Sequence, residues 1–438
     1  MKPHRSERNA KASAKASSAR SGLRIVTVEG ISAIVIIQLL AGPYLTGYLI
    51  HLGAGSGQIG FVLAIPPLAN VLTIFAALYI QRIQSRKRFL VYTAGFHRII
   101  WMLTGLIPFL LPKEWWVGTY IALFLLSFSL SSIGSVAWSS LVSDLVPARV
   151  RGRYFGIRNT ILWAAGCLAL IGGGLLLERF PGDTGFAIIY GVCSLLTVVN
   201  IYHLFLYPDL PFEKSAEASD RAMLMKPLQD RMFFRATLFL AGWIFLQNAV
   251  IPLFSYVMLD VMKLNYFPHV SVITTVQNIS MMFAFYLWGN LNAKWPAQKL
   301  LLWTMPILAL SCFGWLALIW IPAFVTLLAV HILLGIGMGG FNQLAFNFVI
   351  GDTPKADRPT YFAMFSAVTG VTGFLGPTLG GQIYKLLKVA PEWVQTYGYN
   401  ASVGALLLVL AVFVAPRFLS VGWGQRTAKF GVRSKNLI

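Results

Sequence analysis

The sequence predicts an all-α membrane protein with twelve transmembrane helices arranged as two pseudo-symmetric six-helix bundles. Three observations lead to this prediction. Hydrophobic residues make up 57% of the 438 residues and charged residues only 11%, whereas about 25% of the residues of soluble proteins are charged. Twelve apolar segments reach the length of about 20 residues that a spanning helix requires. A short motif recurs about half a chain later, which indicates an internal duplication.

The repeated motif is a basic loop between apolar segments, first at 144–155 and again at 352–362. Counted from Pro147 and from Pro354, an Arg stands four positions later in both copies, and a Tyr-Phe pair starts seven positions later. Glycines follow the same shift of 207 residues, because Gly166 corresponds to Gly373. Two similar halves related by an axis along the membrane normal are an architecture of transporters.

The twelve predicted spans fall into two sets of six, separated by the polar segment 208–234, which we expect to be a cytoplasmic linker. The first bundle covers 25–207 and the second covers 235–416. The predicted spans are 25–50, 57–80, 89–111, 115–143, 157–177, 184–207, 235–260, 268–291, 299–321, 322–350, 360–384 and 395–416.

Both chain ends are basic. Residues 1–24 carry seven Lys or Arg and one Glu among Ala and Ser, which predicts a disordered cytoplasmic tail; a targeting leader is the alternative. The apolar run after residue 24 has about 26 residues, too long for a signal-peptide core. Residues 417–438 form a second basic tail.

The distribution of basic residues predicts the orientation. With the N-terminus inside, 29 of the 35 Lys and Arg residues fall on cytoplasmic segments and five fall on outer segments, as the positive-inside rule requires. Both termini are therefore expected in the cytoplasm, and the membrane is expected to be the plasma membrane. The net charge of +20 lies in loops and tails, so its partner is expected to be the lipid bilayer and not nucleic acid.

The chain resembles the major facilitator superfamily of secondary transporters over nearly its whole length. The segment 144–156 is similar to the connection between helices 4 and 5 of many members. The segment 77–87 resembles the motif between helices 2 and 3 in a degenerate form, with Ala77 and Gln81 where the motif has Gly and Asp. The resemblance implies the twelve-helix fold, a transport function and a central cavity lined by helices 1, 4, 7 and 10.

Two charged residues are predicted inside the membrane. Glu29 lies roughly 7 Å into helix 1 and Arg98 roughly 15 Å into helix 3, at 1.5 Å per residue. A charge at the centre of a spanning helix costs about 2.5 to 3.5 kcal/mol, so each needs an explanation. Arg can reach toward the interface, so a Glu29–Arg98 pair is geometrically possible. One interpretation is a carboxylate that exchanges a proton under the influence of Arg98; the other is a static ion pair, or a Glu29 that reaches cytoplasmic water.

Polar residues on the helices that the resemblance assigns to the cavity are the predicted solute ligands, with helix–helix hydrogen bonding as the alternative. They carry no acid or base deep in the second half. A neutral or amphipathic solute therefore fits better than a phosphate or dicarboxylate, which would need Arg or Lys clamps. The candidates are Gln38, Tyr44, Trp138, Gln247, Asn248, Tyr256, Asn342, Gln343 and Asn347.

The charged residues of the repeated loop are candidates for a cytoplasmic gate, which would exchange ion pairs as the two bundles rock. Positive-inside anchoring without gating is the alternative. The gate candidates are Asp144, Arg151, Arg153, Asp352 and Arg358.

The sequence thus predicts a secondary transporter of a small neutral or amphipathic organic solute, working as a monomer by alternating access. Proton-coupled efflux and uptake of a neutral nutrient both remain open. The alternative is a non-transporting protein of the same fold, a sensor or a partner of lipid or pigment. No cofactor, metal site or enzyme activity is predicted, because the three cysteines and the histidines lack ligand spacing and no nucleotide-binding motif occurs.

Overall fold

A computed structural model describes residues 4–80, 82–146, 148–210, 227–292, 294–351 and 358–419. Every regular element in these residues is helical, as predicted. Eleven of the helical segments are long and apolar enough to cross a membrane. α16 (Arg358–Leu387), a helix of 30 residues, covers the remaining predicted span at 360–384. The predicted fold class is confirmed.

The chain divides into two compact units. Unit 1 comprises 1–217 together with the short segment 264–272, and unit 2 comprises 218–263 and 273–438. The segment 264–272, which belongs to the predicted second bundle by sequence, therefore groups with the first unit. Part of the predicted linker, 211–226, and the tail beyond 419 lie outside the described residues.

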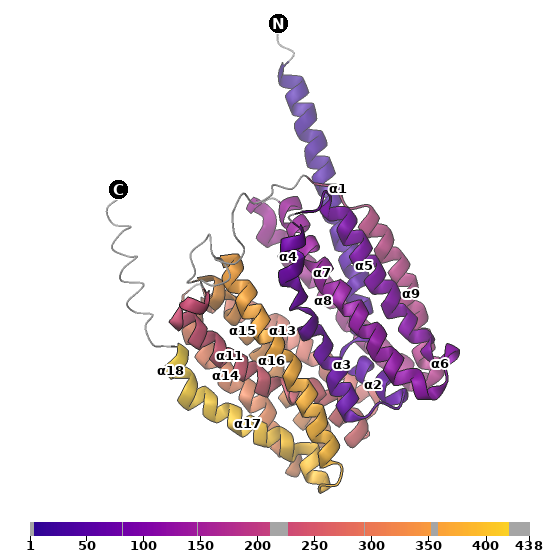
Figure 1. The fold of residues 1–438 in the computed structure, drawn as a ribbon, viewed down its shortest axis with the longest axis vertical. Coiled ribbons are helices and arrows are strands. Elements are labelled where there is room, and N and C mark those ends of the chain that lie inside the picture. Colours follow the sequence, from indigo (N-terminus) through magenta and orange to yellow (C-terminus); the bar gives the residue numbers. More distant parts are fainter. Residues whose placement is uncertain are drawn as a thin grey trace. The chain divides into compact units, whose positions relative to one another are not determined.

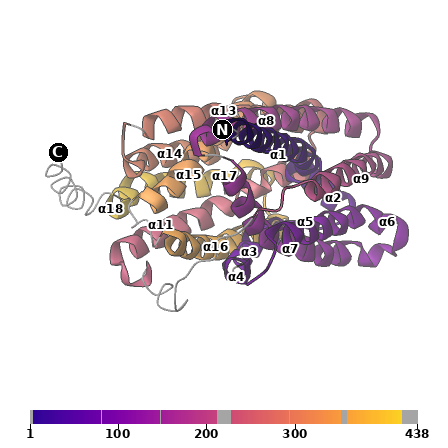
Figure 2. The same ribbon diagram turned by 90° about the horizontal axis from the view of Figure 1, so that it is seen from above.

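Unit 1 is built around two groups of packed helices. α1 lies against α8 and α9, and α5 packs along α7 (Figures 1 and 2). The elements of unit 1 are α1 (His4–Leu40), α2 (Gly42–His51), α3 (Ser56–Ala69), α4 (Leu72–Ile80), α5 (Arg86–Leu103), η1 (Thr104–Leu106), α6 (Ile107–Leu110), η2 (Lys113–Trp115), α7 (Trp116–Leu145), α8 (Ala148–Arg179), α9 (Asp183–Phe205) and η5 (Tyr266–Val270).

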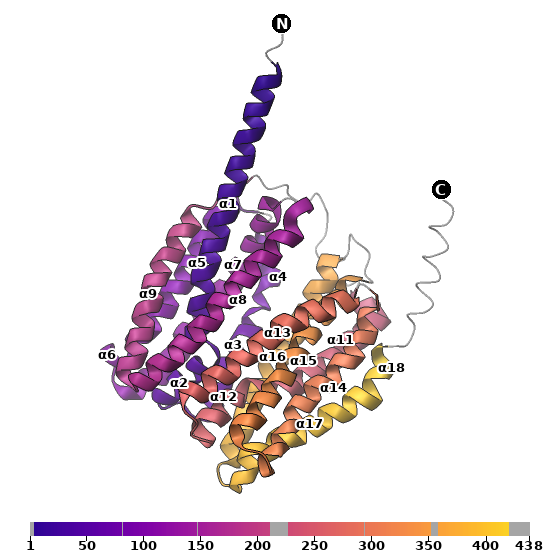
Figure 3. The same ribbon diagram turned by 180° about the vertical axis from the view of Figure 1, so that it is seen from behind.

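Unit 2 has α14 packed against α15 and α17, and α11 against α16 (Figure 3). Besides α16, its elements are α11 (Arg231–Asn248), η3 (Ile251–Leu253), α12 (Phe254–Tyr256), η4 (Val257–Val261), α13 (Ser271–Asn292, its first two residues in unit 1), α14 (Ala297–Phe313), η6 (Gly314–Ile319), α15 (Ala323–Gly351), η7 (Val394–Gly398), α17 (Tyr399–Val409), η8 (Leu410–Val414) and α18 (Ala415–Leu419).

Two sequence expectations differ from the structure. Residues 4–24, expected as a disordered tail, continue α1 as helix (Figure 1), and most of the basic segment expected as a loop forms the first turns of α8, which begins at Ala148. The first segment is rich in Ala, Lys and Arg, and the second carries one Ala and three Arg. These residues have high intrinsic helix propensity. A pattern that looks only for apolar residues therefore places the helix starts too late.

Glycines let α16 approach α11 closely in unit 2. A Cβ atom on Gly380 would lie 2.0 Å from the carbonyl oxygen of Ala249, and one on Gly376 would lie 2.6 Å from the carbonyl oxygen of Phe245. Backbone atoms cannot move aside as flexible side chains do. The contact between these two helices therefore requires residues without a side chain at both positions.

We predict that Gly380→Ala lowers the free energy of unfolding of the protein in detergent by about 1–3 kcal/mol, because the added methyl group overpacks the helix contact. Gly242→Ala in α11 is the matched control, since a Cβ there meets nothing within 4 Å. The control shares the gain in helix propensity from Gly to Ala, so the difference between the two variants isolates the clash. Equal stabilities of the two variants would contradict the prediction.

Candidate functional site

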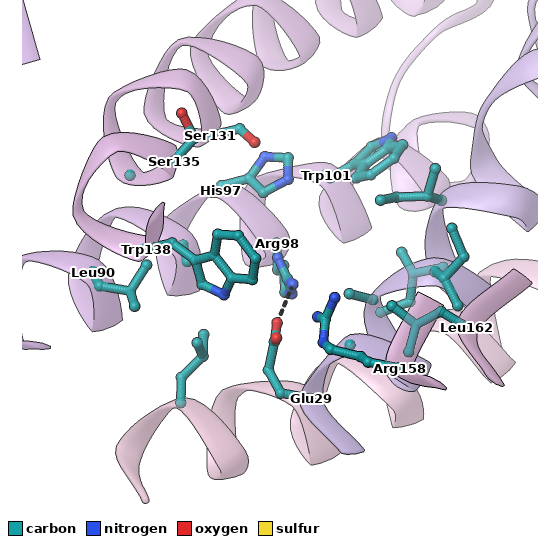
Figure 4. Close-up of a pocket in the computed structure, with 18 residues that line it drawn as sticks. Glu29, Leu90, His97, Arg98, Trp101, Ser131, Ser135, Trp138, Arg158 and Leu162 are labelled. Atoms are coloured by element: carbon teal, nitrogen blue, oxygen red, sulfur yellow. Dashed lines mark hydrogen bonds and ion pairs between the residues drawn. The ribbon is translucent and has the colours of Figure 1, made fainter. Parts of the chain in front are cut away.

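A cavity of about 310 Å³ lies inside unit 1, between helices α1, α5, α7, α8 and α9. Most of its wall is apolar, and its charged residues are Glu29, Arg98 and Arg158, which lie close together in Figure 4. The lining residues are Glu29, Gly30, Ala33, Ile34, Ile36, Ile37, Leu90, Ala94, His97, Arg98, Trp101, Ser131, Gly134, Ser135, Trp138, Arg158, Leu162 and Leu204.

Glu29 is the centre of a hydrogen-bond network at the wall of this cavity. The residue is only 4% exposed. Its Oε1 accepts hydrogen bonds from Arg98 Nη2 at 3.0 Å and from Asn200 Nδ2 at 3.1 Å, and its Oε2 accepts one from the Tyr207 hydroxyl at 3.1 Å. An ionised carboxylate only accepts hydrogen bonds, so a set of three donors fits the charged form.

Asn200 links α9 to α1 through hydrogen bonds next to this carboxylate. Its Nδ2 also lies 2.9 Å from the carbonyl oxygen of Glu29 and 3.0 Å from Ser32 Oγ. The Ser32 hydroxyl in turn donates to the same carbonyl oxygen at 2.9 Å. The backbone on which Glu29 sits is therefore held by side chains of both helices, which fixes the direction of the carboxylate.

The structure brings together the two intramembrane charges that the sequence singles out. Glu29 and Arg98 form an ion pair at 3.0 Å, with 6% and 13% of their side chains exposed. His97, the neighbour of Arg98, is held by Ser127: its Nδ1 lies 2.8 Å from the hydroxyl oxygen and 3.0 Å from the carbonyl oxygen. Its ring also lies beside that of Trp101.

Arg158 is a residue of the site that sequence reasoning missed, because it was grouped with the basic residues of the cytoplasmic loops. It is 8% exposed and lines the cavity from α8. Its guanidinium carbon lies 5.5 Å above the Trp138 ring, and Trp138 Nε1 donates to the Tyr207 hydroxyl at 3.3 Å. The signal available in the sequence is its place inside the predicted span 157–177. In the structure its guanidinium lies against a glycine of α1.

That glycine is Gly30. A Cβ at this position would lie 2.4 Å from Arg158 Nη2, so the guanidinium occupies space that the absence of a side chain at Gly30 leaves open. Gly30 on α1 and Arg158 on α8 are therefore direct neighbours in the packing of these two helices. Arg158 donates to the carbonyl oxygen of Val26 through Nε at 3.4 Å and through Nη2 at 3.5 Å.

Of the three predicted solute ligands in unit 1, Trp138 lines the cavity, whereas Gln38 and Tyr44 are not among its lining residues. Gln38 is half-buried against α8, where Gly166 faces its side chain. Tyr44 is 1% exposed and donates to the carbonyl oxygen of Leu170; its hydroxyl also lies 2.9 Å from Ser271 Oγ. Tyr44 therefore serves a packed hydrogen-bond cluster in this conformation.

The candidates of unit 2 divide into packed and accessible groups. Gln247 is buried and accepts a hydrogen bond from Trp243 Nε1 at 2.9 Å, and Tyr256 packs edge-on against Tyr384. Asn342 is exposed on α15. The half-buried candidates are Asn248, Gln343 and Asn347.

Of the gate candidates, Asp144 has a described partner within unit 1. Its Oδ2 lies 2.7 Å from Arg86 Nη1, and the same nitrogen donates to Ser140 Oγ at 2.6 Å. Arg86 is one of the basic residues that match the helix 2–3 motif, and its side chain is 1% exposed. Asp352 and the side chains of Arg151, Arg153 and Arg358 lie outside the described part of the structure.

Metal binding has no support in the described part of the chain, where no group of three or more His, Cys, Asp or Glu side chains could hold an ion. The three cysteines there are free thiols.

Eleven candidate spans in the described residues and a charged internal cavity are typical of multi-pass membrane transporters, and comparison with known proteins gives the family. The model of the Major Facilitator Superfamily matches residues 30–350 and 268–434. The chain belongs to this superfamily, which consists of transporters and not of enzymes.

One relative and several solved structures illustrate the similarity. The MFS-type transporter ungB of Aspergillus violaceofuscus (strain CBS 115571) is 29% identical over 126 residues, which cover 29% of this chain and 22% of that protein. The match thus spans about a fifth of the relative's length.

The solved structures share the fold at low identity. The nucleoside transporter NupG is 14% identical with a TM-score of 0.62, and the alignment covers 90% of this chain and 98% of that one. A D-xylose-proton symporter is 12% identical with a TM-score of 0.70 and the same coverage. The inward-open xylose transporter XylE from E. coli is 13% identical with a TM-score of 0.64, covering 90% and 96%. These structures establish the fold.

We predict that Arg98→Gln lowers the free energy of unfolding in detergent by about 3–5 kcal/mol, because it leaves the buried Glu29 carboxylate without its counter-charge. The double variant Glu29→Gln/Arg98→Gln should recover most of this loss, since both charges are then absent. Lys263→Gln, which breaks an ion pair whose lysine is 73% exposed, is the control and should cost at most about 1 kcal/mol. A double variant as unstable as the single one would show that pairing is not the reason.

Proposed function

We propose that this protein is a secondary transporter of a small neutral or amphipathic organic solute, which it exports by alternating access in exchange for protons. The observation that supports this proposal best is the position of Glu29. The carboxylate is buried within the membrane-spanning part of unit 1, lines a cavity and is held by donors from α5, from α9 and from Tyr207 just beyond α9.

A proton changes this network in a defined way. Protonation removes the charge of Glu29, so Arg98 loses its ionic partner, and the carboxyl group gains a donor where it had only acceptors. In a region of low dielectric the loss of such an attraction is large compared with water. The network therefore has two charge states with different hydrogen-bond requirements, which is what coupling to a conformational change needs.

The two interpretations of the Glu29–Arg98 pair differ in whether the carboxylate needs access to water. A static pair needs no access to water, whereas a coupling carboxylate must exchange its proton. Both Glu29 and Arg98 contribute to the cavity wall, which favours exchange. Among the solved structures of the same fold, one is named a proton symporter.

The nature of the solute is proposed from the polar residues of the candidate set. The half-buried amides Asn248, Gln343 and Asn347 present donors and acceptors without charge, which suits a neutral or amphipathic molecule. The solved relatives are named for nucleosides and xylose, so uridine and xylose are the first neutral solutes to test. Lipophilic dyes extend the panel to amphipathic compounds.

For the membrane orientation we propose cytoplasmic termini and location in the plasma membrane, with the protein working as a monomer. The positive-inside distribution of Lys and Arg supports this orientation. The Arg86–Asp144 pair would then lie at the cytoplasmic ends of α5 and α7. We propose it as part of an inward gate, together with Arg151, Arg153, Asp352 and Arg358.

We predict that Glu29→Gln abolishes the acceleration of solute flux by a pH gradient in proteoliposomes, while solute counterflow without a gradient continues. Gln keeps hydrogen-bonding atoms for Asn200 and Tyr207 but cannot exchange a proton. Glu114→Gln, the same substitution at an exposed residue, is the control and should behave as the wild type. The measurements are radiolabelled flux and the internal signal of a pH-sensitive dye.

The possible outcomes separate the hypotheses. Unchanged gradient-driven flux in the Glu29→Gln variant would refute the coupling role of Glu29 and leave transport intact. Absence of counterflow across the whole solute panel would refute transport of these classes. It would favour the alternative of a non-transporting sensor, or of a lipid or pigment partner, with this fold.

A further inference from the structure

We propose that the cavity of unit 1 binds the carboxylate group of an amphipathic organic acid, with Arg158 as the recognising residue. This inference rests on the proposed transport function and narrows the solute to a monoanion with an apolar body. It starts from the charges at the cavity wall.

The charges of the cavity do not balance. Two guanidinium groups, Arg98 and Arg158, and one carboxylate, Glu29, line it, so one positive charge is left over. Arginine remains protonated in proteins. Glu29 is paired with Arg98, and among the described residues no carboxylate forms an ion pair with Arg158.

The contacts of Arg158 within the protein are long, and none of them is with a charged group. Its two hydrogen bonds to the Val26 carbonyl oxygen, at 3.4 and 3.5 Å, are longer than the usual 2.7 to about 3.2 Å of such bonds. The contact with the Trp138 ring adds about 0.5–2 kcal/mol of attraction. A buried charge without an ionic partner is costly, so the guanidinium is available to an anion that enters the cavity.

The second guanidinium also has a free donor. Arg98 Nε is buried and has no hydrogen-bond partner among the described residues. Figure 4 shows the charged ends of Arg98, Glu29 and Arg158 lying close together. An anion placed beside them would add a second carboxylate to a cluster that now holds one.

The chemistry of the wall identifies the kind of anion. Planar, bidentate recognition by guanidinium groups matches a carboxylate. One unbalanced positive charge matches the single negative charge of a monoanion. A phosphate dianion or a dicarboxylate would keep a second negative charge without a partner. The rest of the lining is mostly apolar, including Ile34, Ile37 and Leu162, which suits an aliphatic or aromatic body in a volume of about 310 Å³.

The test is thermal unfolding of the purified full chain in detergent, with carboxylates and their neutral primary amides as paired probes. The probes are benzoate, phenylacetate, 4-phenylbutyrate and octanoate, each compared with its amide at equal concentration and ionic strength. A ligand of the folded state raises the apparent Tm by mass action. We expect at least one carboxylate to raise the Tm of the wild type while its amide does not.

Arg158→Met should remove this selectivity and weaken the affinity for that carboxylate by about 10- to 100-fold, as expected for a lost charge-assisted hydrogen bond. The Tm of the unliganded variant should equal or exceed that of the wild type, because an unpaired buried charge is replaced by an apolar chain of similar length. Arg158→Lys, which keeps the charge but not the planar fork, should bind with intermediate affinity. Arg179→Gln, at the exposed end of the same helix, should match the wild type.

Three results would overturn the proposal. They are equal Tm shifts by acids and amides, an equal shift by sodium chloride alone, and retained carboxylate selectivity in the Arg158→Met variant. A large drop in the Tm of unliganded Arg158→Met would assign Arg158 a structural role instead. Since no pH gradient enters this experiment, failure of the Glu29 coupling test leaves its result unaffected.

Discussion

The constraint on which unit 1 depends is that a charge inside a membrane needs a partner. Glu29 satisfies it by drawing donors from α5, α9 and Tyr207 onto α1, so the same contacts that make the carboxylate tolerable also hold these elements together. Under the proposed coupling role of Glu29, the bonds that stabilise unit 1 would also be the ones that respond to the proton. A change of protonation at this point would then act on the helix contacts directly.

The fold was largely predictable because lipid imposes a strong rule: apolar segments of about 20 residues must be helices. The duplication and the distribution of Lys and Arg then limited the topology. Helix starts were less predictable. α1 and α8 begin in basic segments, where helix propensity, and not hydrophobicity, determines the conformation.

The candidate site was predictable in part, for reasons that Glu29 and Arg158 illustrate. The cost of burying a charge singles out Glu29 and Arg98 from sequence position alone. Arg158 stands at the edge of a span, where an arginine reaching into the cavity and one reaching toward lipid headgroups look the same in sequence. The sequence did not single out Asn200 and Tyr207. They are uncharged polar residues near a helix end, and nothing in the sequence distinguishes such a residue that donates to a buried carboxylate from one that only packs between helices.

Gly30 shows how a residue without a side chain shapes the surroundings of a charge. A Cβ atom there would lie 2.4 Å from Arg158 Nη2, so a larger residue would require the guanidinium to move from its present position at the wall of the cavity. Related transporters that keep the arginine but carry a larger residue at the position of Gly30 would then differ in solute charge preference. Under the proposed carboxylate recognition, solute preference would depend on pairs of positions on neighbouring helices as well as on the number of charged residues.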